Sequence, residues 1–113
     1  MIFMEDCIFC QIIKKEVPAK IIYESGNIVV FPDISPGADV HLLIVPKEHI
    51  KEMKDLKNGY GELLSEVFLV SEQLVLENNL EDNVYRVVIN GGSAQHIPHL
   101  HFHFLGGNWW KRE

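Results

Sequence analysis

The sequence of 113 residues lacks several features that would each define a class of protein. It has no low-complexity run, no internal repeat and no apolar stretch near the length of a membrane span, while 47% of its residues are hydrophobic and 23% are charged. These absences exclude a disordered tail, a repeat protein and a chain that crosses a membrane as a helix. We therefore expect one domain, residues 1–113, with a single hydrophobic core.

Basic residues are in the minority, with 10 Lys and Arg against 16 Asp and Glu, which gives a formal net charge of −6. An acidic surface repels a phosphate backbone, so we expect no nucleic acid partner. The first residues, MIFM, are followed at once by Glu5 and Asp6 and lack the basic and then apolar stretch of a secretory signal peptide. We therefore expect a cytoplasmic protein with no membrane partner.

Cysteine is also scarce, and the two cysteines form one C-x-x-C pair, Cys7 and Cys10. In a reducing compartment such a pair is more typical of a metal or redox site than of a structural disulfide. A thioredoxin-like redox pair follows a strand in a βαβ unit, which this sequence does not show, and a zinc site needs two further ligands. Two free buried cysteines in a short helix are the third alternative. The residues alone leave these alternatives open.

Hydrophobic periodicity predicts an α+β fold. Apolar positions recur at three and four from Tyr60 to Asn78, which predicts one long helix, and the spacing in residues 7–16 predicts a short helix that needs a sheet to pack against. Short turns favour antiparallel pairing of the strands. Five β-rich segments are predicted as strands: Ile21–Glu24, Ile28–Phe31, His41–Val45, Tyr85–Asn90 and His99–Leu105.

Histidine is rare except in one segment, HIPHLHFHFL at residues 96–105, which holds four of the six histidines. In an extended chain His99, His101 and His103 share one face, neighbours are roughly 6.6 Å apart, and the apolar residues between them share the other face. Three interpretations remain open. The histidines form a polar surface row, a catalytic metal site with an open position for water, or a nucleophilic site in which a neutral imidazole attacks phosphorus.

The sequence also lacks a G-x-x-x-x-G-K-[ST] phosphate loop, and the histidine segment contains no Lys or Arg. A phosphate would then be held by neutral donors, which we expect to be Asn90, Ser93, Gln95 and the backbone amides of the N-G-G-S turn. Such donors suit a phosphate with few charges. They favour a nucleoside monophosphate ester or amide over a long polyphosphate.

The run HLHFHFL fits the pattern His-x-His-x-His of the histidine triad. Three further segments, IFCQIIKKEVPAKIIYES, VVFPDISPGADVHLLIVPKEHI and YRVVINGGSAQ, are similar in order to successive blocks of the same family over nearly the full length. The chain is identified as a member of the histidine triad (HIT) family and resembles its Hint branch of nucleotide-binding proteins. The resemblance implies one HIT domain with about five antiparallel strands, one long and one short helix, and a homodimer.

The resemblance also implies an activity: hydrolysis of purine nucleoside phosphoramidates through a covalent nucleotidyl-histidine. By position, His101 is the nucleophile, His103 contacts the phosphate and His41 completes the group around the attacking ring. Asp33 accepts from the ribose hydroxyls. The other residues that the resemblance places at the nucleotide, the first two of them on the phosphate or leaving-group side, are Asn90, Gln95, Ile8, Phe9, Ile34 and Ser93.

Some bacterial HIT proteins resemble this chain in carrying the cysteine pair together with two histidines. Carried over to this sequence, the resemblance implies a closed tetrahedral zinc site of Cys7, Cys10, His49 and His99. The zinc would be structural and would tie the short helix to the sheet. His101 would stay available as the nucleophile.

The chain departs from the Hint pattern in a shorter stretch between Asn90 and Gln95, which His96 follows. We hypothesise that His96 donates a proton to the departing amine, and the alternative is an exposed loop histidine. Two other functions remain open. One is a purine-nucleotide-binding module with little turnover. The other is a dinucleoside polyphosphate hydrolase, as in the Fhit branch, although the ending LGG after the triad argues against that branch.

Overall fold

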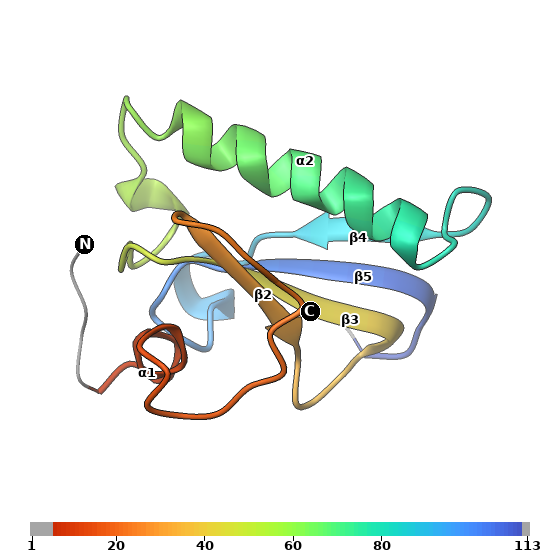
Figure 1. Cartoon of the computed structure of the whole chain (residues 1–113), viewed down its shortest axis with the longest axis horizontal. Helices are drawn as coiled ribbons and strands as arrows, with labels where there is room; N and C mark the ends of the chain where they lie inside the picture. Colours follow the sequence, from red (N-terminus) through yellow and green to blue (C-terminus); the bar gives the residue numbers. More distant parts are fainter. Residues whose placement is uncertain (1–5, 112–113) are drawn as a thin grey trace.

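The computed structural model describes residues 6–111, which form one antiparallel sheet with helices on both faces (Figure 1). The strand order is β1-β2-β3-β5-β4, and every neighbouring pair is antiparallel. This confirms the predicted α+β class, the five strands, and the long and short helices. The elements along the chain are α1 (Ile8–Ile13), β1 (Tyr23–Glu24), β2 (Ile28–Pro32), β3 (Ala38–Pro46), the 3₁₀ turn η1 (Met53–Asp55), α2 (Gly61–Glu77), β4 (Tyr85–Val88), the 3₁₀ turn η2 (Gly92–Ala94) and β5 (Phe102–Trp109).

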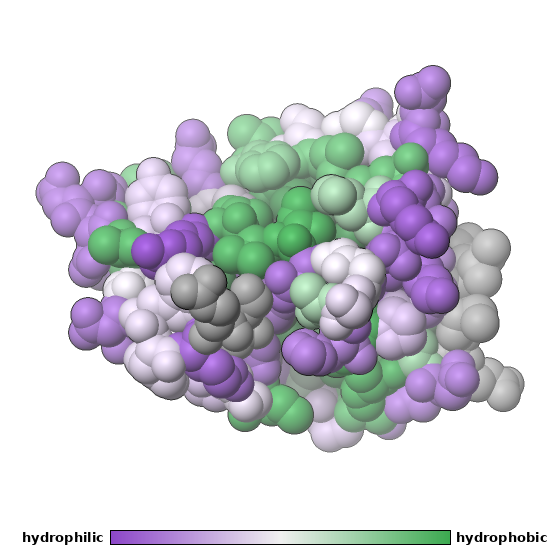
Figure 2. All heavy atoms as spheres, turned by 180° about the vertical axis from the view of Figure 1, so that it is seen from behind, coloured by the Kyte–Doolittle hydropathy of each residue, from purple (hydrophilic) through white to green (hydrophobic). Residues whose placement is uncertain are grey.

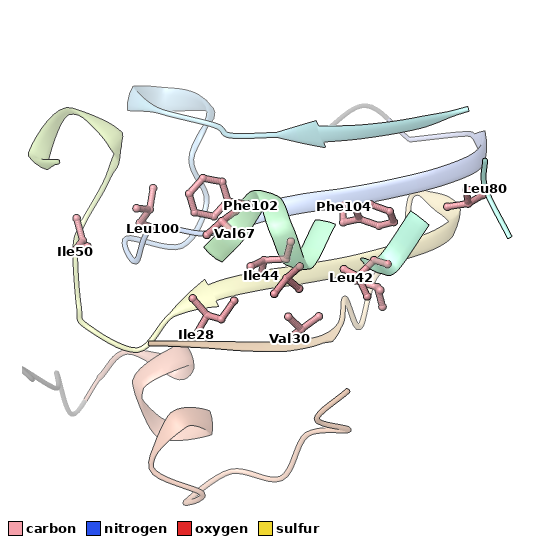
Figure 3. Close-up of a cluster of buried hydrophobic side chains, with 12 residues drawn as sticks. Ile28, Val30, Leu42, Ile44, Ile50, Val67, Leu80, Leu100, Phe102 and Phe104 are labelled. Atoms are coloured by element: carbon pink, nitrogen blue, oxygen red, sulfur yellow. The ribbon is translucent and has the colours of Figure 1, made fainter. Parts of the chain in front are cut away.

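The long helix α2 packs on one face of the sheet and lies within one residue of its predicted ends. Its buried apolar residues meet inward-facing residues of β2, β3 and β5 in one core (Figure 3). Phe102 and Phe104 of β5 are completely buried there, and each such side chain contributes about 1.5–3 kcal/mol. No helix in residues 6–111 is both long and apolar enough to cross a bilayer.

The short helix α1 packs on the opposite face, which confirms the prediction that it packs against the sheet. Its residues Phe9, Cys10, Ile12 and Ile13 are buried against side chains of β2 and β3. The Cys7 thiol caps the first turn by accepting from the Cys10 backbone N–H at 3.4 Å. The helix is shorter than the predicted residues 7–16, because a left-handed backbone at the following lysine pair, with φ 64° at residue 15, turns the chain away.

The predicted strand at residues 99–105 was wrong at both ends, because β5 begins at Phe102 and continues to Trp109. Before Phe102 the backbone bonds elsewhere: the His99 N–H donates to the Ile97 carbonyl at 2.8 Å and the Leu100 N–H to the Ile50 carbonyl at 2.6 Å. The alternation of side chains nevertheless continues through this segment. The apolar residues face α2, and the histidines face α1.

Candidate active site and metal-binding cluster

A cavity of about 670 Å³ lies on the α1 side of the sheet, within the usual size range for a small-molecule site. Its walls are mostly apolar and come from α1, the segment after it, β2 and β3. The titratable and amide side chains in its lining are Asp33, Asn90, His96, His101, His103, Lys20 and Lys111. An apolar chamber with a few polar groups suits a ligand with a flat apolar part and a polar end.

His101 is a buried ring whose neutral tautomer is set by the backbone. It is only 7% exposed, and its Nδ1 lies 2.7 Å from the carbonyl oxygen of His99. A carbonyl can only accept, so Nδ1 carries the proton and Nε2 keeps the lone pair. The edge of the Phe9 ring packs on the imidazole with the ring centroids 5.2 Å apart. The lone pair of the neutral ring therefore lies on Nε2.

A second backbone contact sets the tautomers of two more histidines. The Gly37 N–H donates to His41 Nδ1 at 2.8 Å, so a neutral His41 carries its proton on Nε2. That Nε2 donates a hydrogen bond to Nδ1 of His103 at 2.9 Å. His103 must then carry its own proton on Nε2. His103 thus presents an N–H donor on Nε2, and its ring centroid lies 5.0 Å from that of His101.

Burial keeps His103 in this neutral form. Its pKa is lowered from 6.5 to about 4, mainly by desolvation and then by the neighbouring rings of His101 and His41, while the carboxylate of Asp33 opposes the shift. Asp33 Oδ2 lies 3.3 Å from His41 Nε2, and its Oδ1 accepts from the Ser35 N–H at 2.8 Å. The aspartate therefore forms both the turn of its own loop and part of the polar end of the cavity.

The structure brings together most of the residues predicted for the nucleotide site. His41 reaches the cavity through its hydrogen bond to His103. Two predicted phosphate donors lie elsewhere: the Gln95 side-chain amide donates to the Lys51 and Ile97 carbonyls at 2.7 and 2.8 Å, and Ser93 lies exposed in η2. The short turn η2 directs both away from the cavity. The predicted residues that line the cavity are Ile8, Phe9, Asp33, Ile34, Asn90, His101 and His103.

Two lysines in the cavity lining were missed by the sequence analysis. Lys20 follows α1, and Lys111 lies just after β5, where its ammonium donates to the carbonyl and hydroxyl oxygens of Ser35 at 2.7 Å each. The expectation that only neutral groups surround the phosphate is therefore incomplete. No local pattern marks either lysine, because only the folded chain brings them to the triad. His96, singled out as a proton donor, also lines the cavity and is exposed.

Beside the cavity, Cys7, Cys10, His49 and His99 form a second group, referred to below as the Cys/His cluster. Their ligand atoms all lie within 4.8 Å of one another. Nδ1 of His99 is 3.3 Å from the Cys7 sulfur, 3.6 Å from the Cys10 sulfur and 3.1 Å from Nδ1 of His49. Zinc bonds of about 2.0–2.3 Å separate tetrahedral ligand atoms by roughly 3.3–3.8 Å. The spacing of the cluster fits such an ion.

The protonation of His99 also fits a metal ligand. Its Nε2 donates to the Pro46 carbonyl at 2.8 Å, which leaves the lone pair on Nδ1, the atom that faces the cysteines. Burial lowers the pKa of His99 to about 4, so the ring is neutral near pH 7. Four protein donors, two sulfur and two nitrogen, correspond to a closed structural site.

Possible ligand atoms of Asp33, His41 and His103 also lie within 4.8 Å of one another, but their proton positions do not suit a metal site. The Gly37 N–H occupies Nδ1 of His41, so the Nε2 that faces the other two residues carries a proton and cannot bind a cation. We call these three residues the relay cluster, because hydrogen bonds fix the proton positions of its two histidines.

Comparison with known proteins agrees with the fold and with the triad. Residues 6–111 match a family model described as scavenger mRNA decapping enzyme C-term binding. The protein HitA of Neisseria gonorrhoeae is 36% identical over 104 residues, which cover 91% of this chain and 97% of HitA. The crystal structure of a HIT family hydrolase from Legionella pneumophila superposes with a TM-score of 0.87 at 40% identity and covers 91% of this chain and 94% of that chain.

A zinc-bound histidine triad family protein from Mycobacterium smegmatis has the same fold, with a TM-score of 0.76, 26% identity, and coverage of 91% of this chain and 76% of that chain. The family-model match spans residues 6–111, the range that holds the triad, the relay cluster and the Cys/His cluster. The chain therefore belongs to the histidine triad (HIT) family.

Proposed function

We propose that the protein is a hydrolase of purine nucleoside phosphoramidates that works through a nucleotidyl-His101 intermediate. The observation that carries the proposal is the pair of tautomers at the polar end of the cavity. His101 keeps the lone pair on Nε2, and His103 beside it carries a proton on Nε2. One ring attacks phosphorus while the other donates to a phosphate oxygen. The similarity to a HIT family hydrolase supports a hydrolytic reaction.

In the first step, Nε2 of His101 attacks phosphorus, the phosphorus–nitrogen bond of the substrate breaks, and the departing amine takes up a proton. The attack makes the His101 ring cationic. Its Nδ1–H remains bonded to the His99 carbonyl, which stabilises that charge. In the second step, water attacks phosphorus and gives a proton to the group that protonated the amine, the bond to His101 breaks, and the nucleoside monophosphate leaves. We assign His96 as the proton donor to the amine, since it lines the cavity and an imidazole can act as a general acid.

The remaining cavity residues account for a nucleotide. The apolar side chains of Ile8, Phe9 and Ile34 offer a surface for the purine, with Ile34 fully exposed at the rim. The carboxylate of Asp33 accepts from the ribose hydroxyls, and the amide of Asn90 donates to the phosphate. The cavity therefore presents groups for each part of a nucleoside monophosphate.

The test is turnover of an adenosine phosphoramidate by the wild type and by His101→Ala, with mass spectrometry to trap AMP on His101. We expect AMP release by the wild type, a loss of about 10⁴-fold or more in the variant, and an adduct at His101 alone. Nucleotide binding with no AMP release from any substrate would instead indicate a binding module.

A second candidate substrate class, the dinucleoside polyphosphates, is favoured by one observation. Lys20 and Lys111 add two cations to the cavity lining, and cations suit a substrate with several phosphate charges. Including diadenosine polyphosphate in the same assay decides between the two classes. Faster cleavage of the polyphosphate by the wild type would replace the phosphoramidate as the proposed substrate.

We propose zinc as the ion of the Cys/His cluster, with Cys7, Cys10, His49 and His99 as its ligands and a structural role. The donor set, the spacing and the His99 tautomer support it, as does the zinc-bound relative. A cytoplasmic location, also proposed, would keep both thiols reduced for binding. Metal analysis of the purified protein tests the assignment, with about one zinc per chain expected.

We also propose a homodimer. The edge strand β4 pairs only with β5, so one of its edges is open within the described residues. Figure 2 shows hydrophobic side chains gathered across the middle of the face seen from behind. A second copy would cover such a surface. The exposed apolar residues of α2 and the β4 edge are Phe68, Leu69, Leu76, Val84 and Tyr85. Light scattering of the wild type and of Leu69→Glu tests whether this surface forms a dimer interface.

A further inference from the structure

We propose that His99 is a positioning residue that links the Cys/His cluster to the nucleophile, so that metal binding holds His101 in its reactive tautomer and shapes the nucleotide cavity. The inference rests on the proposed roles of zinc and of His101. It adds a dependence of the active site on the cluster that neither role requires by itself.

One residue takes part in both sites through different groups. The side chain of His99 points its Nδ1 at the two cysteine sulfurs, while its backbone carbonyl accepts from Nδ1 of His101 at 2.7 Å. The far side of the His99 ring is fixed by the bond from Nε2 to the Pro46 carbonyl. A ligand bond at Nδ1 would therefore hold the ring at both nitrogens. The carbonyl on the same residue would then keep its place under His101.

Phe9 provides a second link between the cluster and the cavity. It lies in α1 between Cys7 and Cys10, is buried, and also lines the cavity. Its ring packs edge-to-face against both imidazoles, with centroid distances of 5.8 Å to His99 and 5.2 Å to His101. An ion shared by the two cysteines would therefore press this wall of the cavity against the nucleophile.

The helix that carries these residues has little stability of its own. α1 has six residues, well below the roughly 12–15 that an isolated helix needs in water. Its place is set by apolar packing and by the cluster. Loss of the cluster would let α1 and Phe9 move away from the sheet. The cavity wall and the contact on the His101 ring would loosen together.

The experiment compares zinc-loaded protein with the same protein after chelation, at one fixed pH. Two quantities are measured besides turnover: AMP affinity by calorimetry, and the ¹⁵N chemical shifts of the His101 ring nitrogens. We expect zinc removal to weaken AMP binding about tenfold. We also expect it to move the two ¹⁵N shifts toward each other, because the ring then exchanges between tautomers.

Two variants separate the metal from its surroundings. Lys51→Ala is the matched control, because Lys51 lines a smaller cavity of about 390 Å³ beside Cys7 and His49 but offers no ligand. It should keep zinc, AMP affinity and both ¹⁵N shifts. Phe9→Leu should keep zinc and lose AMP affinity, which isolates the contribution of the ring. Circular dichroism verifies folding. If chelation unfolds the chain, the variant His49→Gln is used in the comparison in place of the chelated protein. This variant removes one of the four ligands and leaves three in place.

The inference is overturned if zinc removal leaves both the AMP affinity and the His101 shifts unchanged, or if the protein neither contains nor takes up zinc. The proposed function fails in a different way. Absence of turnover on every substrate, with AMP affinity and the ¹⁵N shifts still responding to zinc, would remove the enzyme and keep the link through His99.

Discussion

The Cys/His cluster and the relay cluster are built from similar side chains and lie on the same side of the sheet, yet their chemistry differs. In the first, a backbone carbonyl from Pro46 accepts from the outer nitrogen of His99 and leaves a lone pair facing inward. In the second, a backbone N–H from Gly37 donates to the outer nitrogen of His41 and leaves a proton facing inward. One backbone group decides whether the histidine binds a cation or donates a proton.

The largest expected effect comes from removing the zinc proposed for the Cys/His cluster. With free zinc at about 1,000 times its Kd, binding stabilises the fold by about 4 kcal/mol, and chelation or Cys10→Ser should remove that amount. Denaturant unfolding with and without zinc measures it. His41→Phe, on the relay cluster, should keep one zinc per chain. Two zinc ions per wild-type chain would contradict the distinction between the clusters.

The second largest expected effect is a loss of folding stability in acid, caused by protonation of His103 in the relay cluster. The pKa of His103 is about 4 in the folded chain against about 6.5 when unfolded, so the unfolded chain binds more protons between these values. The stability contribution is complete above about pH 6.5 and is lost as the pH falls to about 4, by an amount on the order of 3 kcal/mol. Unfolding curves of wild type and His103→Gln across this range test it. An equal slope in both proteins would place the titration elsewhere.

Breaking the proton order of the relay cluster should slow catalysis. His41→Phe keeps the aromatic volume but removes the Nε2–H that donates to His103, so His103 no longer presents a single tautomer. We expect kcat to fall about 100-fold with little change in KM. His41→Asn, which keeps a side-chain donor, is the matched control and should recover part of the rate. Equal rates in the two variants would argue against the relay.

The smallest effect is expected from the carboxylate of the relay cluster. Asp33→Asn keeps the side-chain oxygen that accepts from the Ser35 N–H but loses the charge proposed to bind the ribose. KM should rise about tenfold with kcat within about twofold. A 2′,3′-dideoxy substrate should show the same rise with the wild type and no further rise with the variant. A large loss of kcat would instead assign Asp33 a direct part in the chemistry.

Local pattern was sufficient for the parts of the fold that depend on periodicity. The alternation in residues 99–105 predicts which side chains of β5 enter the core with α2, and it holds even though His99 and His101 precede the strand. The three-and-four spacing of α2 predicts its ends within one residue. The boundaries of β5 were missed because the backbone of residues 99–101 bonds to a loop and to a side chain rather than to the sheet.

The features of the candidate site likewise fall into those that follow from the sequence and those that follow from the fold. The sequence by itself determined the residue types, the shared face of the triad histidines and, through resemblance, the partners of the cysteine pair. Only the tertiary structure decided that Gln95 turns away from the cavity and that Lys20 and Lys111 join it. It also decided which nitrogen carries the proton in the four buried histidines, His41, His99, His101 and His103. Side-chain direction follows from local backbone geometry, whereas proton positions follow from carbonyl and amide groups that the fold brings from distant parts of the chain.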